Sequence, residues 1–236
     1  MILHNKEMIQ MNTELIPSFE QSLTAPPLDL GIDFAEIAID ALFENEIVSE
    51  VPVAKTIVAL WKTGTAIRDR KLLKNSLVFL QEFHSDTTIS KKIQKHKDRL
   101  ETDEKFFVAE LERILLLLDR FLDCERAKIL AKFFRAYINE KITRAEFTEV
   151  SDITDRIFPY DLTVLTTAYN ENGIDFDDTY NYRIDRLISL GLLENPQRLG
   201  KFNIMDGGSI TDEDDEELKD ISITKLGKLY YQYGIA

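Results

Sequence analysis

The most constraining feature of the sequence is a strongly apolar segment between Glu104 and Leu122. On a helix, its apolar residues cover well over half of the circumference: Phe106, Phe107, Leu111, Ile114, Leu115, Leu117, Leu118, Phe121 and Leu122. A helix that is apolar on most sides has to be covered by other elements. The segment therefore predicts the central helix of a helical bundle, and the predicted fold class is mainly α.

Amphipathic helices are predicted before this segment. From Asp33 to about Glu46, apolar residues recur at i, i+3, i+4, i+7 and i+8, the pattern of one buried helix face. A long helical region begins at Pro52, because proline suits the first turn of a helix. A short basic helix is predicted from about Lys91 to Leu100. Residues 1–32 show no sustained period and are predicted to form an acidic amino-terminal arm.

Two capping signals follow the apolar segment. Asp123 is a predicted N-cap of the next helix. Thr143 and Glu146 have the spacing of a capping box and predict a further helix that starts at Arg144. Pro159 ends this helical block. The helical bundle is therefore predicted to span residues 33–158.

A different pattern begins after Pro159. Two helices are predicted there, at residues 162–170 and 178–190. Short strands follow at residues 192–194, 201–205 and 221–223, with an acidic loop between the last two. A closing helix is predicted at residues 225–231. Helix, helix, strand, wing and strand is the order of a winged-helix domain. Residues 159–236 are therefore predicted to form a small winged-helix-like α+β domain.

The middle of the chain carries a series of short motifs. They are Val51-Pro52-Val53-Ala54, Ala66-Ile67-Arg68-Asp69-Arg70, Leu115-Leu116-Leu117-Leu118-Asp119-Arg120, Lys132-Phe133-Phe134-Arg135-Ala136-Tyr137, Ile142-Thr143-Arg144-Ala145-Glu146-Phe147 and Ile153-Thr154-Asp155-Arg156. Over roughly residues 50–162 these motifs resemble a family of uncharacterised bacterial helical proteins of about this length. The resemblance implies a bacterial origin and a helical core, and the family supplies no established activity and no catalytic residues.

Charge is unevenly distributed along the chain. The net charge is −13, with −9 in residues 1–50, +4 in residues 51–156 and −8 in residues 157–236. An acidic chain is a poor non-specific ligand for nucleic acid, because phosphate contacts need clustered lysine and arginine. The single cysteine, the absence of a signal-peptide pattern and the absence of an apolar run of ~20 residues predict a cytoplasmic protein without an integral membrane segment.

No catalytic or metal-binding pattern is found in the sequence. Cys124 has no evident partner spacing with His4, His84 or His96, and no zinc-binding spacing is present. The acidic run from Asp212 to Glu217 lacks the loop glycine and acid spacing of an EF-hand. The protein is therefore predicted not to be an enzyme and to use no cofactor and no metal.

Three surfaces are predicted to take part in interactions. The first is a basic cluster made of Lys91, Lys92, Lys95, Lys97 and Arg99. The second is the exposed face of the second helix in the winged-helix-like domain, with Asn181, Arg183 and Arg186. The third is the acidic wing, with Asp212, Asp214 and Asp215. In a winged helix, that second helix enters the DNA major groove. A wing with six consecutive carboxylates is repelled by phosphate, which disfavours nucleic acid as the partner.

These features favour a non-enzymatic interaction or adaptor protein, as one part of a multi-component system, whose partner is another protein or a second copy of the chain. Two alternatives stay open at this point. One is a DNA-binding transcriptional regulator that uses Arg183 and Arg186. The other is a membrane-active effector in which the apolar helices around Val53–Trp61 and Phe106–Leu122 open onto lipid.

Overall fold

The computed structural model describes residues 14–26, 33–38, 41–42, 48–61, 66–86, 88–99, 104–174, 182–195 and 220–236. The chain divides into two compact units, Met1–Ser151 and Asp152–Ala236. The division lies within helix α9 (Arg144–Arg156), ahead of the boundary predicted at residue 158. The described residues are mainly helical, as the sequence predicts, and include one two-stranded sheet.

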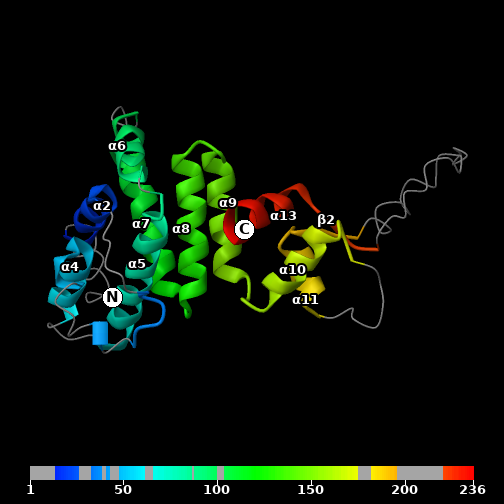
Figure 1. The fold of residues 1–236 in the computed structure, drawn as a ribbon, viewed down its shortest axis with the longest axis horizontal. Coiled ribbons are helices and arrows are strands. Elements are labelled where there is room, and N and C mark those ends of the chain that lie inside the picture. Colours follow the sequence, from blue (N-terminus) through cyan, green and yellow to red (C-terminus); the bar gives the residue numbers. More distant parts are fainter. Residues whose placement is uncertain are drawn as a thin grey trace, which may run out of the picture. The chain divides into compact units, whose positions relative to one another are not determined.

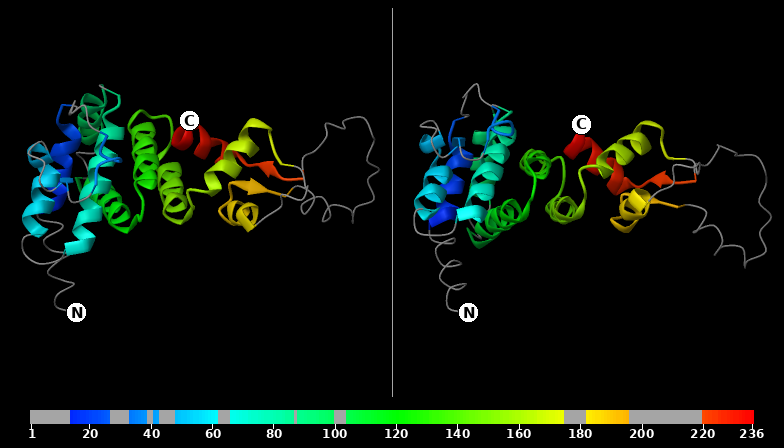
Figure 2. Two further views of the ribbon diagram at one scale, coloured as in Figure 1. Left: turned by 60° about the horizontal axis from the view of Figure 1, so that its bottom comes forward. Right: turned by 90° about the horizontal axis from the view of Figure 1, so that it is seen from below.

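The amino-terminal unit is built from helices (Figures 1 and 2). Its elements are α2 (Ile16–Thr24), the short 3-10 helix η2 (Val48–Glu50), α4 (Pro52–Trp61), α5 (Ala66–Phe83), α6 (Ile89–Arg99), α7 (Glu104–Arg120), α8 (Cys124–Ile138) and the first part of α9.

Helices α5 and α8 form the most extensive helix pair of this unit, and α5 also packs on α4 and α7. The central position predicted for residues 104–122 is therefore wrong. Phe106, Val108 and Leu116 of α7 are exposed, whereas α8 buries ten of its residues. Alanines along α8, such as Ala127 and Ala131, allow close packing, and a count of large apolar residues does not detect them.

An aromatic cluster forms the centre of the amino-terminal unit. Phe83 of α5 stacks on Phe134 of α8, with ring centroids 5.4 Å apart, and Phe134 lies 5.5 Å from Phe147 of α9. Phe79 of α5 contacts Phe19 of α2 at 5.7 Å. Offset and tilted aromatic pairs at such distances add about 0.5–1.5 kcal/mol each to the burial of the rings. The cluster therefore connects α2, α5, α8 and α9 through contacts between their rings.

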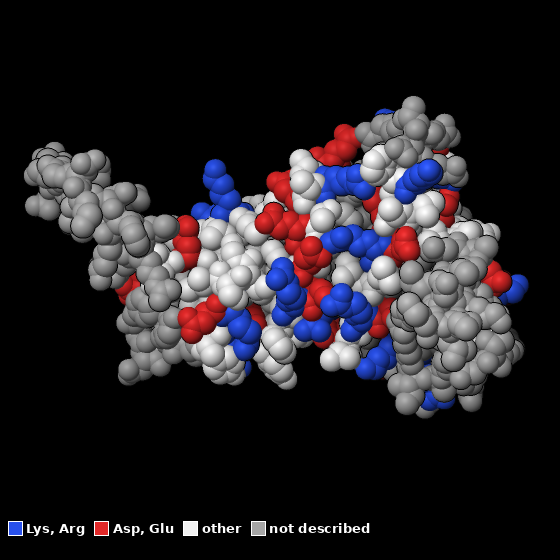
Figure 3. All heavy atoms as spheres, turned by 180° about the vertical axis from the view of Figure 1, so that it is seen from behind, with Lys and Arg blue, Asp and Glu red and all other residues white. Residues whose placement is uncertain are grey.

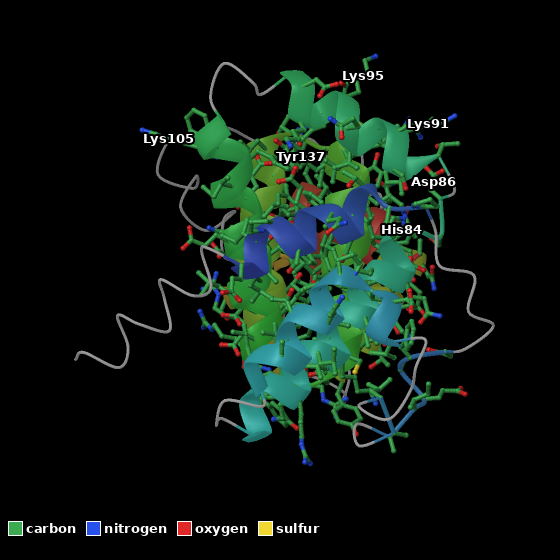
Figure 4. The ribbon with its side chains drawn as sticks, turned by 90° about the vertical axis from the view of Figure 1, so that its left-hand side faces the viewer. His84, Asp86, Lys91, Lys95, Lys105 and Tyr137 are labelled. Carbon is green, nitrogen blue, oxygen red and sulfur yellow. The ribbon has the colours of Figure 1, made fainter. Side chains whose placement is uncertain are left out.

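The predicted arm at residues 1–32 contains helix α2, so this part of the prediction needs correction. Ile16, Phe19 and Leu23 are buried and lie on one face of α2, which packs on α4, α6 and α7. Figure 4 shows α2 crossing the bundle between α6 and α4. The Ser22 hydroxyl accepts a hydrogen bond from the backbone N–H of Val53 at 3.0 Å. Tertiary partners thus stabilise a nine-residue helix that would be marginal alone.

The helix predicted from Asp33 is not formed at its start, where residues 34–36 make a turn. The Asp33 carboxylate accepts a hydrogen bond from the Ala35 N–H at 2.8 Å, and this local bond competes with helix formation. Phe34 and Leu42 are buried, as the apolar pattern predicts.

Both predicted capping signals are confirmed. The Asp123 carboxylate accepts a hydrogen bond from the Arg126 N–H at 3.1 Å and caps α8. The Glu146 carboxylate accepts from the Thr143 N–H at 2.7 Å, and the Thr143 hydroxyl accepts from the Glu146 N–H at 3.2 Å, which completes the capping box of α9.

The carboxyl-terminal unit combines helices with a small antiparallel sheet. After the end of α9 come α10 (Asp161–Asn170), α11 (Tyr182–Ser189), strand β1 (Leu193–Glu194), strand β2 (Ser222–Ile223), α13 (Lys225–Tyr230) and the π-helix η5 (Tyr231–Ile235). Leu193 pairs with Ile223 and Glu194 with Ser222, and an isolated bridge joins Ile174 to Ile221. The strand predicted at residues 201–205 lies outside the described residues.

Helix α13 is anchored closely against this sheet. Thr224 caps α13 by accepting a hydrogen bond from the Gly227 N–H at 2.9 Å, and its hydroxyl donates to the Gly191 carbonyl at 2.7 Å. Gly191 has a φ of 74°, in the left-handed region that favours glycine. On the other side of α13, the buried Tyr230 hydroxyl lies 3.0 Å from the Thr154 hydroxyl of α9.

Candidate functional site

An ion pair with a buried carboxylate joins α10 to α11 in the carboxyl-terminal unit. Asp161, in the first turn of α10, is fully buried with 0% exposure. Arg186 of α11 donates from Nε to Oδ2 of Asp161 at 2.9 Å and from Nη2 to Oδ1 at 2.5 Å. The hydrogen bonds to Asp161 raise the pKa of Arg186 above its ordinary value. A two-point fork of this kind fixes the orientation of the guanidinium group.

Aromatic rings surround the same arginine. The Arg186 guanidinium carbon lies 4.7 Å from the ring centroid of Phe158 and 4.8 Å from that of Tyr182, within cation–π range. Arg183, one residue after Tyr182, lies 5.8 Å from the ring of Tyr160. We name Phe158, Tyr160, Tyr182, Arg183 and Arg186 the aromatic–arginine surface.

The rings of this surface are exposed to solvent. Phe158 is 51% exposed, Tyr160 74% and Tyr182 64%, and they are the large hydrophobic residues that are exposed in the described part of this unit. The two arginines were predicted from the sequence, and the three rings were not. The signal was present in the sequence Phe158-Pro159-Tyr160, which was interpreted only as a domain boundary.

The structure changes the role predicted for Arg186. Two of its three nitrogens donate to Asp161, so the side chain is not available as a bidentate reader of bases. Asn181, Asp212, Asp214 and Asp215 lie outside the described residues. The structure therefore brings together two of the predicted residues of this unit, Arg183 and Arg186, and adds three aromatic ones.

The basic cluster predicted on α6 is divided by the structure. Lys91 and Lys95 are exposed, and Figure 4 shows both pointing away from the bundle. Lys92 forms an ion pair with Asp86 at 3.2 Å, and Lys97 forms one with Glu20 of α2. Lys97 therefore attaches α6 to α2 and is not a member of an exposed basic surface. The side chain of Arg99 lies outside the described residues.

Charges of both signs are mixed on one face of the described surface. Figure 3 shows lysine and arginine side chains interspersed with aspartate and glutamate side chains over the face that it presents. The phosphates of a nucleic acid are neutralised by clustered cations. This face therefore has no wide basic area of the kind that a nucleic acid needs.

A buried carboxylate joins four helices of the amino-terminal unit. Glu110 of α7 is 5% exposed and accepts a hydrogen bond from the Tyr137 hydroxyl of α8 at 2.9 Å. Nε of Arg144 of α9 lies 3.2 Å from the same carboxylate, and Nε2 of His96 of α6 lies 3.4 Å from it. All three groups converge on one carboxylate, so the arrangement links helices and satisfies a buried charge.

Cys124 and His84, two of the residues considered for nucleophilic chemistry, are each shifted in pKa by burial in the helical packing. Burial raises the pKa of the Cys124 thiol, which disfavours the reactive thiolate. Burial also lowers the pKa of His84, whose Nε2 lies 3.0 Å from the Ser22 carbonyl oxygen of α2. Within the residues that the structure describes, no group of three or more histidine, cysteine, aspartate or glutamate side chains is arranged to hold a metal ion.

Among these features, the aromatic–arginine surface is both exposed and held in a fixed geometry. None of the helices in the described part of the chain combines the length and the apolar character needed to cross a membrane. We compared the chain with protein-family models, curated proteins and solved structures, and none of them matched.

Proposed function

We propose that this protein is a non-enzymatic interaction protein and that its carboxyl-terminal unit binds another protein through the aromatic–arginine surface. The observation that carries this proposal is the exposure of Phe158 and Tyr182 beside Arg186, which Asp161 holds in place, with the exposed ring of Tyr160 beside Arg183. Tyrosine, phenylalanine and arginine are enriched at protein–protein interfaces, and tyrosine and arginine dominate their hot spots.

The fixed geometry of this surface supports the same proposal. Ordering side chains on binding costs about 0.5–1.5 kcal/mol for each flexible side chain that becomes immobile. Arg186 is already ordered by two hydrogen bonds to a buried carboxylate and by two adjacent rings. The entropy of ordering Arg186 is therefore already lost in the unbound protein, which favours tight association with a partner of complementary shape.

A winged helix is the fold that we propose for residues 159–236. The order α10, α11, β1, β2 and the antiparallel pairing of β1 with β2 support it, as does the bridge between Ile174 and Ile221. Winged helices bind proteins as well as DNA, and fold alone does not decide between them. We also propose a cytoplasmic location in a bacterial cell, on the basis of the single cysteine and the family resemblance of residues 50–162.

The two alternatives receive less support than protein binding. A DNA-reading role for α11 needs Arg186, which is engaged by Asp161. A membrane-active role needs apolar helix faces that are open to lipid. Val53 and Ile57 of α4, and Leu111 and Ile114 of α7, are buried in the core of the amino-terminal unit. The core-facing sides of both helices are therefore occupied by packing, and the apolar residues of α7 that are exposed, such as Phe106 and Leu116, lie outside that core.

Affinity purification of the tagged, full-length chain from its native cells, with and without nuclease, tests the proposal. Tyr160→Ala and Tyr182→Ala should each reduce recovery of a specific partner protein by about tenfold, the effect of removing one hot-spot side chain. Leu122→Ala is the matched control, because Leu122 is 75% exposed and lies in the other unit.

The proposal fails if the two tyrosine variants recover the partner as well as the wild type and the Leu122→Ala control do. Recovery of DNA that disappears on nuclease treatment, with loss of DNA in an Arg183→Gln variant, would instead support the regulator alternative. Thermal unfolding of each variant shows whether a loss of binding reflects a loss of folding.

A further inference from the structure

A surface pocket of about 470 Å³ lies at one end of the amino-terminal unit. It is lined by two lysines of α6, by the last residue of α8 and by the turn that follows α8: Lys92, Lys95, Ile138, Asn139, Glu140 and Lys141. Glu140 has a φ of 57°, so the chain reverses direction there and places Lys141 on the pocket wall. The proposed protein-binding surface lies in the other unit, so an inference from this pocket is independent of it.

The polar side chains that line the pocket are mainly hydrogen-bond donors. Lys92 is held in place, because its Nζ donates to Oδ1 of Asn139 at 2.7 Å and to Oδ2 of Asp86 at 3.2 Å. Since Oδ1 of Asn139 accepts this bond, the amide nitrogen of Asn139 remains as a donor. The side chains of Lys95 and Lys141 are exposed, and their ammonium groups make no hydrogen bond or ion pair within the part of the chain that the structure describes. The one carboxylate on the wall is that of Glu140.

The lysines of α6 are not explained by the helix end beside them. The amino end of a helix favours negative charge, yet Lys91 and Lys92 lie in the first turns of α6, whose first turn has no acidic residue. The carbonyl groups at the end of α8 are already satisfied, because Arg135, Ala136 and Tyr137 accept from the N–H groups of residues 139–141. Lys141 follows the carboxyl end of α8, where positive charge is favoured, and Lys92 pairs with Asp86, so Lys95 is the lysine of the pocket wall that neither a helix end nor an ion pair among the described residues explains.

We propose that this pocket binds a small phosphorylated molecule. Lys95 and Lys141 contact the phosphate oxygens, and Lys92 and Asn139 complete the donor set from fixed positions. A phosphate group carries about −1.5 to −2 charge and three strong acceptor oxygens, which match ammonium and amide donors. The pocket volume falls within the range of ~300–1,000 Å³ that is typical of small-molecule sites.

Titration calorimetry of the full-length chain with inorganic pyrophosphate, at low ionic strength, tests this inference. We expect saturable binding to one site, with affinity lowered about tenfold in Lys95→Gln and in Lys141→Gln, the loss that follows removal of one charge-assisted hydrogen bond. Lys91→Gln is the matched control. It removes the same charge from the same exposed face of α6 but from a residue outside the pocket wall, so its affinity should change less than about twofold.

Three outcomes would overturn the inference. One is the absence of saturable binding of pyrophosphate. Another is an equal loss of affinity in Lys91→Gln and Lys95→Gln, which would show a diffuse electrostatic attraction and not a site. The third is binding of a DNA duplex without binding of pyrophosphate, which would assign the lysines to a nucleic acid. The substituted side chains are exposed, and unchanged thermal unfolding would confirm that each variant is folded.

Discussion

Replacing Gly227 with alanine sets two effects of opposite sign against each other. Gly227 lies inside α13, and alanine in the middle of a helix is about 1 kcal/mol more favourable than glycine. An alanine Cβ at this position, however, would lie 2.1 Å from the carbonyl oxygen of Leu192 and 2.8 Å from Cγ1 of Ile223. The first of these contacts is with backbone, which no change of rotamer can relieve.

The magnitude follows from the contacts that would have to move. Real Cβ atoms essentially never approach another heavy atom closer than 3.0 Å, so α13 and Leu192 must separate by about 0.9 Å. The Leu192 carbonyl accepts the Thr224 N–H at 3.1 Å, and that bond would be lost on such a separation. Overpacking costs about 1–3 kcal/mol and a lost hydrogen bond about 1 kcal/mol. After the gain in helix propensity, we expect a net loss of about 1–3 kcal/mol.

Hydrogen exchange of the full-length chain, followed by mass spectrometry, measures this loss where it occurs. Peptides from β1, β2 and α13 should exchange roughly 5- to 150-fold faster in Gly227→Ala, whereas peptides from α8 should be unchanged.

Gly191→Ala is the control for a conformational effect. Its Cβ would meet only Leu226 Cδ2, at 3.7 Å, but its φ of 74° costs a non-glycine residue about 1–2 kcal/mol. Gly191→Asn should cost less, since asparagine tolerates this conformation better. If the peptides from β1, β2 and α13 exchange no faster in Gly227→Ala than in wild type, the close packing of α13 on Leu192 is refuted.

Two further predictions concern buried titratable groups. Because burial lowers the pKa of His84 below 6.5, the unfolded chain takes up the proton first as the pH falls. The free energy of unfolding should therefore decrease as the pH drops through about 6.5, and this decrease should be smaller in His84→Gln than in wild type. Urea unfolding at several pH values measures it. An equal pH dependence in the two proteins would contradict a lowered pKa of His84. Because burial raises the pKa of Cys124, its alkylation by iodoacetamide at neutral pH should be slower than that of a free thiol, and faster alkylation would reopen a catalytic role.

Local signals were predictable from the sequence. The N-cap at Asp123 and the capping box at Thr143 depend on residues only three apart, and both form as predicted. The elements that escaped prediction depend on distant partners. Helix α2 is short, and it is stabilised by contacts such as Ser22 with Val53 and with His84, which the local sequence does not show. The pairing of α5 with α8 likewise depends on contacts between segments that are distant in sequence.

The candidate surface was predicted only in part for the same reason. Arg183 and Arg186 were selected because they are cations on a predicted recognition helix. Asp161 lies 25 residues before Arg186 in the sequence, so its bond to that arginine is visible only in the fold. The spacing of Tyr182 and Arg186 by four residues does place them on one helix face, and this pattern was a local signal for a ring beside a cation.

The pairing of Arg186 with Asp161 also determines whether electrostatic or hydrophobic interactions dominate binding at this surface. A cation whose charge is balanced by a buried carboxylate releases few counterions when it meets a partner, so binding at this surface should depend weakly on salt. Association there would come mainly from removing the rings of Phe158, Tyr160 and Tyr182 from water. The lysine pocket of the other unit has the opposite character, because Lys95 and Lys141 have no carboxylate partner among the described residues and their attraction for phosphate is screened by salt. The ionic-strength dependence of each binding reaction therefore distinguishes the two sites without any substitution.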